Sequence, residues 1–253
     1  MSEIVIRSER DDAVRTITLN RPEKRNALTR EMFDVLVDAF EGQPAPAERV
    51  TVLRAEGTVF CAGVDLGQRA DNPTGAGESP LERLCDAIRR YPLPVVAVVQ
   101  GHAIGGGMML ALHCDFVVAT EEARLGNTAV QLGLVPAWEP TRRILDAVGA
   151  TLARELLLLG DPVPAGRLAG SHAIAGVVPP AQLDAAVDVV VTRLASNAPL
   201  SLRAVKATLN AEAHVEAEHP AADDAIARAQ ASEDAVEGVS ARKEKREPQF
   251  AGR

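Results

Sequence analysis

The sequence predicts an α/β fold with a helical C-terminal part. Short apolar runs alternate with helical patterns over the first two thirds of the chain. The fully apolar run 95–99 leads into a helix that begins at the triplet Gly105-Gly106-Gly107, which is a βα unit. Beyond Arg142 the apolar residues recur at helical spacing only. With 253 residues and no internal repeat, one α/β core followed by helices is the simplest architecture.

The first predicted elements are a hairpin and an amphipathic helix. Residues 4–7 and 14–19 are short β-branched runs, and the polar residues 9–12 form the expected turn between them. Thr29 is the expected cap of the helix and Gly42 its stop. The apolar side chains at helical spacing are Phe33, Leu36, Val37 and Phe40.

Buried strands alternate with helices in the middle of the chain. Residues 50–54, 95–99 and 116–119 read as strands, and residues 105–113 read as the helix between the last two. Residues 71–79, rich in Pro, Gly, Asn and Ser, predict a loop. A further helical stripe consists of Leu81, Leu84, Cys85 and Ile88.

The C-terminal third predicts helix after helix. The clearest patterns cover residues 152–159, 183–194 and 201–212. Residues 221–236, rich in Ala, Asp and Glu, have only a weak apolar face.

Composition predicts a soluble, cytoplasmic protein. Hydrophobic residues make up 47% and charged residues 25%, which is ordinary for a globular domain. No run approaches the roughly 18 apolar residues of a membrane span. The N-terminus lacks the basic flank and long apolar stretch of a signal peptide.

Charge and aromatic content argue against a nucleic-acid partner. The 27 Lys and Arg face 35 Asp and Glu, and the resulting charge of −8 would repel a phosphate backbone. Aromatic residues are 3% of the chain, too few for a base-stacking surface. The basic run 242–246 is interrupted by Glu244 and is typical of a solvated helix end.

The cysteines predict neither a disulfide framework nor a metal site. Cys61, Cys85 and Cys114 are odd in number and far apart, so reduced, mostly buried thiols are expected. Histidines and cysteines also lack the spacing of metal ligands. His113, Cys114 and Asp115 are neighbours, but successive side chains point in different directions, which favours packing roles.

Two loops present backbone amides where a helix begins. They cover residues 58–66 and 100–108, and each follows a predicted strand. Such amides suit an oxyanion, and two of them could stabilise a thioester enolate by about 3–4 kcal/mol each. The glycines alone also fit close packing of a helix against a sheet, an alternative that the spacing leaves open. The pattern is neither a Walker loop nor GxGxxG, which disfavours a nucleotide-phosphate site.

The chain resembles the crotonase (enoyl-CoA hydratase/isomerase) superfamily in five motifs and in its ending. The resemblance carried by the five motifs runs from about Ile4 to Gly176. The segments occur in the family's order. They are Leu19-Asn20-Arg21-Pro22 with Arg25-Asn26-Ala27-Leu28, Phe60-Cys61-Ala62-Gly63-Val64-Asp65-Leu66, Gly101-His102-Ala103-Ile104-Gly105-Gly106-Gly107, Cys114-Asp115, Gly133-Leu134-Val135-Pro136, and the ending Glu244-Lys245-Arg246-Glu247-Pro248-Gln249-Phe250.

The resemblance implies a fold, a ligand and an assembly. The expected architecture is a crotonase-like spiral of ββα units over residues 1–195 and a helical trimerisation region over residues 196–253. The implied ligand is an acyl-CoA thioester, with no cofactor beyond its coenzyme A moiety. The implied assembly is a homotrimer or a dimer of trimers.

The resemblance also assigns roles to individual positions. The backbone amides of Val64 and Gly106 would donate to the thioester oxygen, beside Gly105. Arg25 and Ala27 would lie near the adenine and phosphate end of coenzyme A. Three residues, Ala62, Asp65 and Leu66, would lie near the pantetheine and the thioester. Asp65 is also expected to cap backbone amides.

The chain departs from the hydratase pattern at the positions that carry proton transfer. Where the resemblance places the two glutamates of a hydratase, this sequence has Met109 and Ala129. Neither side chain can move a proton, and loss of one positioned acid or base costs about 10²- to 10⁴-fold in rate. The stretch Ala137-Trp138-Glu139-Pro140 replaces a glycine-rich one and is expected to narrow the acyl pocket.

Glu139 is the one carboxylate near the expected acyl end. It is a hypothetical acid or base, but a negative charge at the start of a helix, next to Pro140, is equally explained by the helix dipole. Trp138 either walls the pocket or fills the core. His102, close to the oxyanion loop, is better explained by packing.

Two functions follow from these residues. The first is an enzyme that stabilises an enolate of an acyl-CoA or enoyl-CoA, as an isomerase or another specialised crotonase with Glu139 as acid or base. The second is a catalytically silent acyl-CoA-binding or regulatory protein, which the identities of Met109 and Ala129 favour.

Overall fold

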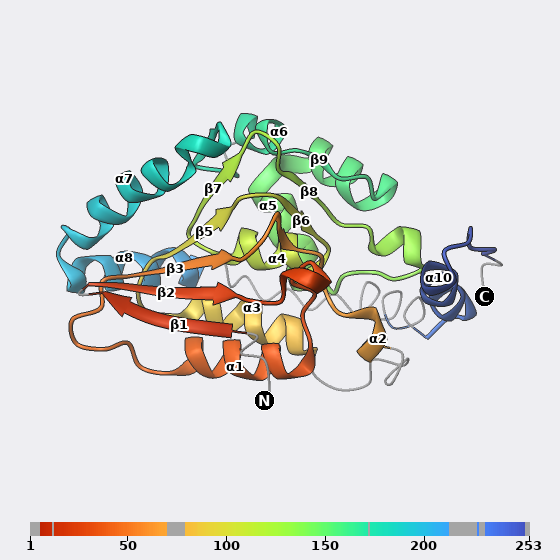
Figure 1. Ribbon diagram of the computed structural model, residues 1–253, viewed down its shortest axis with the longest axis horizontal. Coiled ribbons are helices and arrows are strands. Elements are labelled where there is room, and N and C mark those ends of the chain that lie inside the picture. Colours follow the sequence, from red (N-terminus) through yellow and green to blue (C-terminus); the bar gives the residue numbers. More distant parts are fainter. Residues whose placement is uncertain are drawn as a thin grey trace.

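A mostly parallel sheet with helices on both faces forms the centre of the molecule (Figure 1). The computed structural model describes residues 6–11, 13–69, 79–171, 173–212, 227 and 231–250. The six-stranded sheet has the order β1-β2-β3-β5-β7-β10, with β1 antiparallel to β2 and the other pairs parallel. Its strands are β1 (Ile6–Asp11), β2 (Val14–Leu19), β3 (Val50–Ala55), β5 (Val95–Val99), β7 (Phe116–Thr120) and β10 (Gly176–Val178).

A second, four-stranded sheet of short strands follows the carboxyl ends of the main sheet. Its order is β4-β6-β8-β9. The strands are β4 (Val59–Cys61), β6 (His102–Ile104), β8 (Arg124–Gly126) and β9 (Val163–Pro164). Because β4, β6 and β8 each begin a few residues after a strand of the main sheet ends, the chain winds as a repeated two-strand step. The α/β fold predicted from the sequence is confirmed.

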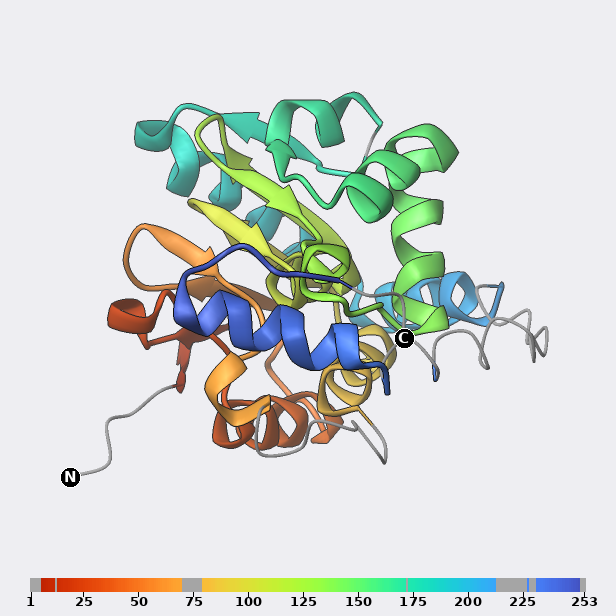
Figure 2. The same cartoon turned by 90° about the vertical axis from the view of Figure 1, so that its right-hand side faces the viewer.

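Helices cover both faces of the main sheet. Helices α1 (Arg30–Glu41), α3 (Pro80–Arg90) and α4 (Gly106–His113) pack on one face, and α7 (Leu183–Ala195) covers the other. The remaining helical segments are η1 (Pro22–Lys24), α2 (Leu66–Arg69), η2 (Ala129–Leu132), α5 (Trp138–Arg154), η3 (Glu155–Leu159), α6 (Ala165–Gly170), η4 (Pro180–Gln182), α8 (Pro199–Glu212) and α10 (Glu233–Glu244). Figure 2 shows α10 crossing the side of the molecule turned toward the viewer.

Strand β5 shows why the centre of the sheet is apolar throughout. All of its residues are buried, as expected for a parallel strand covered on both faces. Val95, Ala97 and Val99 face the core beneath α1, α3 and α4, whereas Val96 and Val98 pack toward α7.

An ion pair between a buried lysine and an aspartate fastens α8 to the sheet. Lys206, 6% exposed, lies 2.6 Å from the carboxylate of Asp115 and also donates to the carbonyl of Leu93 at 2.9 Å. Asp115 accepts the amide of Val95 at 2.8 Å. Asp115 therefore joins the β5 and β7 region to α8 through main-chain and side-chain bonds.

Most predicted elements are present, with a few corrections. Strand β1 runs on to Asp11, so most of the predicted turn at 9–12 is strand, because the antiparallel register continues to the Asp11–Val14 pair. Thr29 caps α1 by accepting the amide of Met32 at 3.2 Å, as predicted. The predicted loop 71–79, except Ser79, and most of segment 221–236 lie outside the described residues.

The prediction of buried cysteines without disulfide bonds also has a structural counterpart. Cys61, Cys85 and Cys114 are free and buried. In the described part of the chain, no helix is long and apolar enough to cross a membrane.

Candidate functional site

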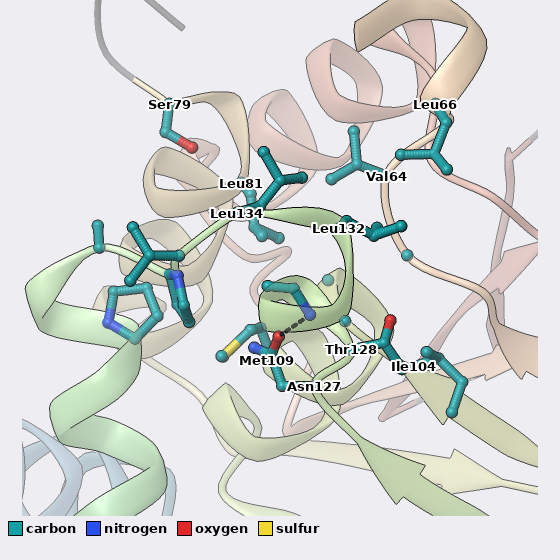
Figure 3. A pocket seen from close by; sticks show the side chains of 18 of the residues that line it. Val64, Leu66, Ser79, Leu81, Ile104, Met109, Asn127, Thr128, Leu132 and Leu134 are labelled. Atoms are coloured by element: carbon teal, nitrogen blue, oxygen red, sulfur yellow. Dashed lines mark hydrogen bonds between the residues drawn. The ribbon is translucent and has the colours of Figure 1, made fainter. Parts of the chain in front are cut away.

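A cavity of about 200 Å³ lies where the second sheet meets α4. Its walls come from the loop after β4, the start of α4, the segment around η2, the first turns of α3 and α5, and Arg242 of α10. Figure 3 shows how Val64, Leu81, Leu132 and Leu134 approach it from different elements. The lining is mostly apolar, so a polar group bound inside would depend on a few donors.

Two glycines let the β4 and β6 loops touch. Gly63 has φ 95° and Gly105 has φ 55°, values that favour glycine. A Cβ atom on Gly63 would lie 2.9 Å from the carbonyl oxygen of Ile104 and 3.3 Å from the nitrogen of Gly106. The residue after Gly63 and the first residue of α4 are thereby brought to the same part of the cavity.

The amides of Val64 and Gly106 have no protein acceptor within the described residues. On either side of Val64, the amide of Leu28 donates to Gly63 and that of Asp65 donates to Leu28, at 2.8 and 2.9 Å. The amide of Gly105 donates to the Gly126 carbonyl at 2.8 Å, which leaves the next N–H, of Gly106, at the open start of α4. Both residues line the cavity. Two unpaired donors from separate loops therefore face one space.

Asp65 fastens its loop rather than lining the cavity. Its carboxylate lies 2.6 Å from the guanidinium of Arg21 and accepts the amide of Gly67 at 2.9 Å. The adjacent predicted residues Ala62 and Leu66 do line the cavity.

Arg25 and Ala27 lie beside this loop. Arg25 has an exposed side chain and φ 53°, and its carbonyl accepts the amide of Ala62 at 3.0 Å. The carbonyl of Ala27 accepts from Arg21 at 3.1 Å. Neither Arg25 nor Ala27 lines the cavity itself.

Asn26 explains why this segment keeps its shape. Its side chain is fully buried and accepts the amide of Arg21 at 2.9 Å. It also donates to the carbonyls of Glu56 and Val59, at 2.9 and 2.8 Å. Asn26 stands in the first of the family-like motifs, and the resemblance assigns it no role of its own. Asn is well suited to the position because it tolerates the observed φ of 52°.

Met109 and Ala129 both line the cavity. Met109, labelled in Figure 3, is 1% exposed on the first turns of α4. Nearby, Asn127 accepts the amide of Ala129 at 3.0 Å. The positions at which the resemblance places hydratase glutamates therefore face the cavity and offer it no acid or base.

Glu139 pairs with a buried histidine. Its carboxylate lies 3.3 Å from Nε2 of His113, whose Nδ1 lies 2.7 Å from the carbonyl oxygen of Met109. A carbonyl can only accept, and a carboxylate also accepts, so the two contacts together favour a doubly protonated imidazolium.

The electrostatics of this pair agree with that assignment. Burial lowers the pKa of His113, but the sulfur of Cys85 and the carboxylate of Glu139 outweigh it and raise the pKa to about 10. The hydrogen bond from His113 holds the pKa of Glu139 below its usual range. Glu139 is therefore ionised at neutral pH, and it is not among the residues that line the cavity.

Trp138 lies outside the cavity lining, whereas two charged residues that were not predicted as site residues belong to it. Trp138 begins α5 and is 36% exposed, outside the lining. Glu82 and Arg242 also line the cavity, although no sequence motif indicates either as a site residue. At the start of α3, Ser79 accepts the amide of Glu82 at 3.5 Å, a capping pattern that indicates a helix start and not a binding site. Residues 242–246 are exposed, as predicted for a solvated helix end, but sequence spacing does not show that Arg242 also borders a cavity.

Comparisons with known proteins identify a matching family model and similar chains. Residues 9–253 match the family model described as enoyl-CoA hydratase/isomerase. The chain is 33% identical to the 2,3-dehydroadipyl-CoA hydratase of Escherichia coli K12, over 100% of both chains.

Two solved structures are also similar. An enoyl-CoA hydratase from Mycobacterium avium subsp. paratuberculosis K-10 has a TM-score of 0.85 and 30% identity, over 98% of both chains. Methylmalonyl-CoA decarboxylase complexed with 2S-carboxypropyl CoA has a TM-score of 0.91 and 25% identity, over 100% of both chains.

Proposed function

Because the chain belongs to the enoyl-CoA hydratase/isomerase family of the crotonase superfamily, we propose that it binds an acyl-CoA thioester and stabilises its enolate with the amides of Val64 and Gly106. The observation that carries the proposal is the pair of unpaired N–H groups on adjoining loops of one cavity. An enolate concentrates negative charge on the thioester oxygen, and fixed donors in a water-poor site stabilise that charge without reorganisation.

Water addition by the family's usual route is not part of the proposal. It needs a positioned acid and base, and Met109 and Ala129 supply neither. Glu139 stays the proposed carboxylate for proton transfer in an isomerase-like reaction. To act, it would have to exchange its contact with His113 for a contact with substrate.

Decarboxylation is a second candidate, favoured by the absence of both hydratase glutamates from the cavity lining. When a malonyl-type thioester loses CO₂, the Cα–carboxyl bond breaks and its electron pair enters the thioester as an enolate. No protein base removes a proton in that step, and water can later return one to Cα. One of the similar solved structures is a methylmalonyl-CoA decarboxylase, which supports testing this reaction here.

A panel of thioesters in heavy water separates the candidate functions. Enoyl-CoA, saturated acyl-CoA and malonyl-type CoA substrates are followed for hydration, double-bond migration, exchange at Cα and CO₂ release. The enolate proposal predicts exchange, migration or CO₂ release with at least one class. Tight binding without any of these reactions would favour the silent acyl-CoA-binding protein.

Gly106 offers a direct test of the donor pair. Gly106→Pro removes the N–H at the first helical position, where proline is well tolerated, whereas Gly106→Ala keeps it. A Cβ at this position meets only side chains of Leu81 and Val64, both at 3.4 Å. We expect the Pro variant to lose about 10²- to 10³-fold in kcat relative to the Ala variant. Equal kcat values in two folded variants would remove Gly106 from the mechanism.

Glu139→Gln tests the proton-transfer role separately. If Glu139 moves the proton, the variant loses exchange or migration while thioester binding stays. Decarboxylation would survive the change, since its first step needs no carboxylate.

A further inference from the structure

We propose that Arg242 is a carboxylate-binding residue of the cavity, and that the natural ligand is an acyl-CoA whose acyl group carries its own carboxylate. This rests on the proposed function, because it concerns the same acyl-CoA site.

Arg242 is the cation among the described residues that line the cavity. Glu82 is the other charged residue there, and the remaining lining is apolar or uncharged. An arginine in such surroundings favours a negatively charged group, because its planar guanidinium matches a carboxylate in a bidentate geometry.

The guanidinium of Arg242 is not used within the described structure. Arg246, one turn further along, pairs with Glu237 and Glu244. Arg242 makes no hydrogen bond or ion pair through its side chain in the part of the chain that is described. Its charge is therefore available to a ligand, whereas that of Arg246 is not.

Helix α10 is docked so that Arg242 faces the cavity. A Cβ on Gly238 would lie 2.3 Å from the carbonyl oxygen of Leu132, and one on Gly133 would lie 2.4 Å from that of Asp234. The backbone of α10 thus rests directly on the η2 segment, which leads into the cavity wall. Arg242 follows Gly238 by one helical turn and shares that face.

The position of Arg242 favours an acyl carboxylate over the phosphates of coenzyme A. The cavity of about 200 Å³ contains Val64 and Gly106, the proposed donors to the thioester. That volume is below the usual size of a site for a drug-sized ligand, so only part of an acyl-CoA fits within it. The phosphates are separated from the thioester by the whole pantetheine arm, whereas the acyl group begins at the thioester carbon.

Matched pairs of thioesters test the proposal by calorimetric titration. Malonyl-, succinyl-, glutaryl- and adipyl-CoA are each compared with the uncharged acyl-CoA of equal chain length, and with free coenzyme A. We expect the wild type to prefer at least one carboxylated member. Arg242→Gln should weaken binding of that member by about tenfold to a hundredfold and leave its uncharged counterpart unchanged. Arg242→Lys should retain part of the preference.

Lys243→Gln is the matched control, since Lys243 is exposed like Arg242 and carries the same charge but lies outside the lining. Equal weakening of all ligands, free coenzyme A included, by Arg242→Gln would assign Arg242 to the phosphates and overturn the inference. A wild type with no preference in any pair would also overturn it and leave the proposed function standing. A wild type that binds no CoA thioester would refute the proposed function itself.

Discussion

The two sides of the cavity are built by different means. On the β4 and α4 side, backbone amides and glycines form the surface, and the loops are fixed by main-chain hydrogen bonds. On the α5 and α10 side, the charges come from side chains placed by packing between distant segments: Arg242 lines the cavity, and Glu139 lies between the lining residues Ala137 and Pro140 but outside the lining itself. Any substitution of Val64 other than proline keeps its amide, whereas one substitution removes Glu139 or Arg242. The first side can therefore persist while the second changes the reaction.

The largest expected loss of stability is at Gly107, and it distinguishes a glycine needed for packing from Gly106, which is proposed to serve the site. A Cβ on Gly107 would lie 2.3 Å from the carbonyl oxygen of Cys61, and backbone cannot move aside cheaply. Gly107→Ala should therefore destabilise the protein by about 3 kcal/mol, despite the better helix propensity of alanine. Denaturant titration measures this, with Gly106→Ala as the control that should change stability by less than about 0.5 kcal/mol. Similar losses at both positions would show that the whole triplet serves packing.

The sequence predicted the backbone-built side far better than the other. Strand β5 and the glycine triplet are local signals, and an uninterrupted apolar run next to three glycines has few structural solutions. The short strands β4, β6 and β8 were not predicted, because three residues are too few to show a period.

The side-chain-built wall depends on long-range packing that no local pattern records. Glu139 was found as the start of a helix, but its buried partner His113 lies 26 positions away in sequence. Arg242 reaches the cavity because Gly238 fits against Leu132, which becomes visible only when both segments are placed.

A smaller loss of stability is expected at Asn26. It tests whether side-chain hydrogen bonds, as well as glycines, fix the β4 and α4 side of the cavity. Asn26→Ala removes three hydrogen bonds and places alanine at a φ of 52°. We expect a loss of about 2 kcal/mol in unfolding free energy. Asn26→Gly loses the same bonds without the strain and should be the less destabilised variant if φ matters. If neither variant weakens the fold or thioester binding, the 20–28 segment does not position the Ala62 to Leu66 loop.

The smallest expected loss of stability is at the ion pair between Glu139 and His113. Glu139→Gln leaves the His113 imidazolium without its counter-charge, but the Glu139 side chain is 53% exposed and solvent screens the contact. We therefore expect a loss of only about 1 kcal/mol near neutral pH. Asp146→Asn, which removes an exposed partner of Arg142 on the same helix, is the control and should cost less.

The pH dependence of that loss decides whether Glu139 is held by a charged His113. The raised pKa of His113 means that its contribution is complete below about 6.5 and disappears as the pH rises toward about 10. The lowered pKa of Glu139 means that its contribution is present above about 4.5 and disappears as the pH falls. The Tm difference between wild type and Glu139→Gln should therefore be largest between these limits, at about pH 4.5 to 6.5. A difference that does not change with pH would mean that His113 is neutral, and Glu139 would then be freer to act as a base.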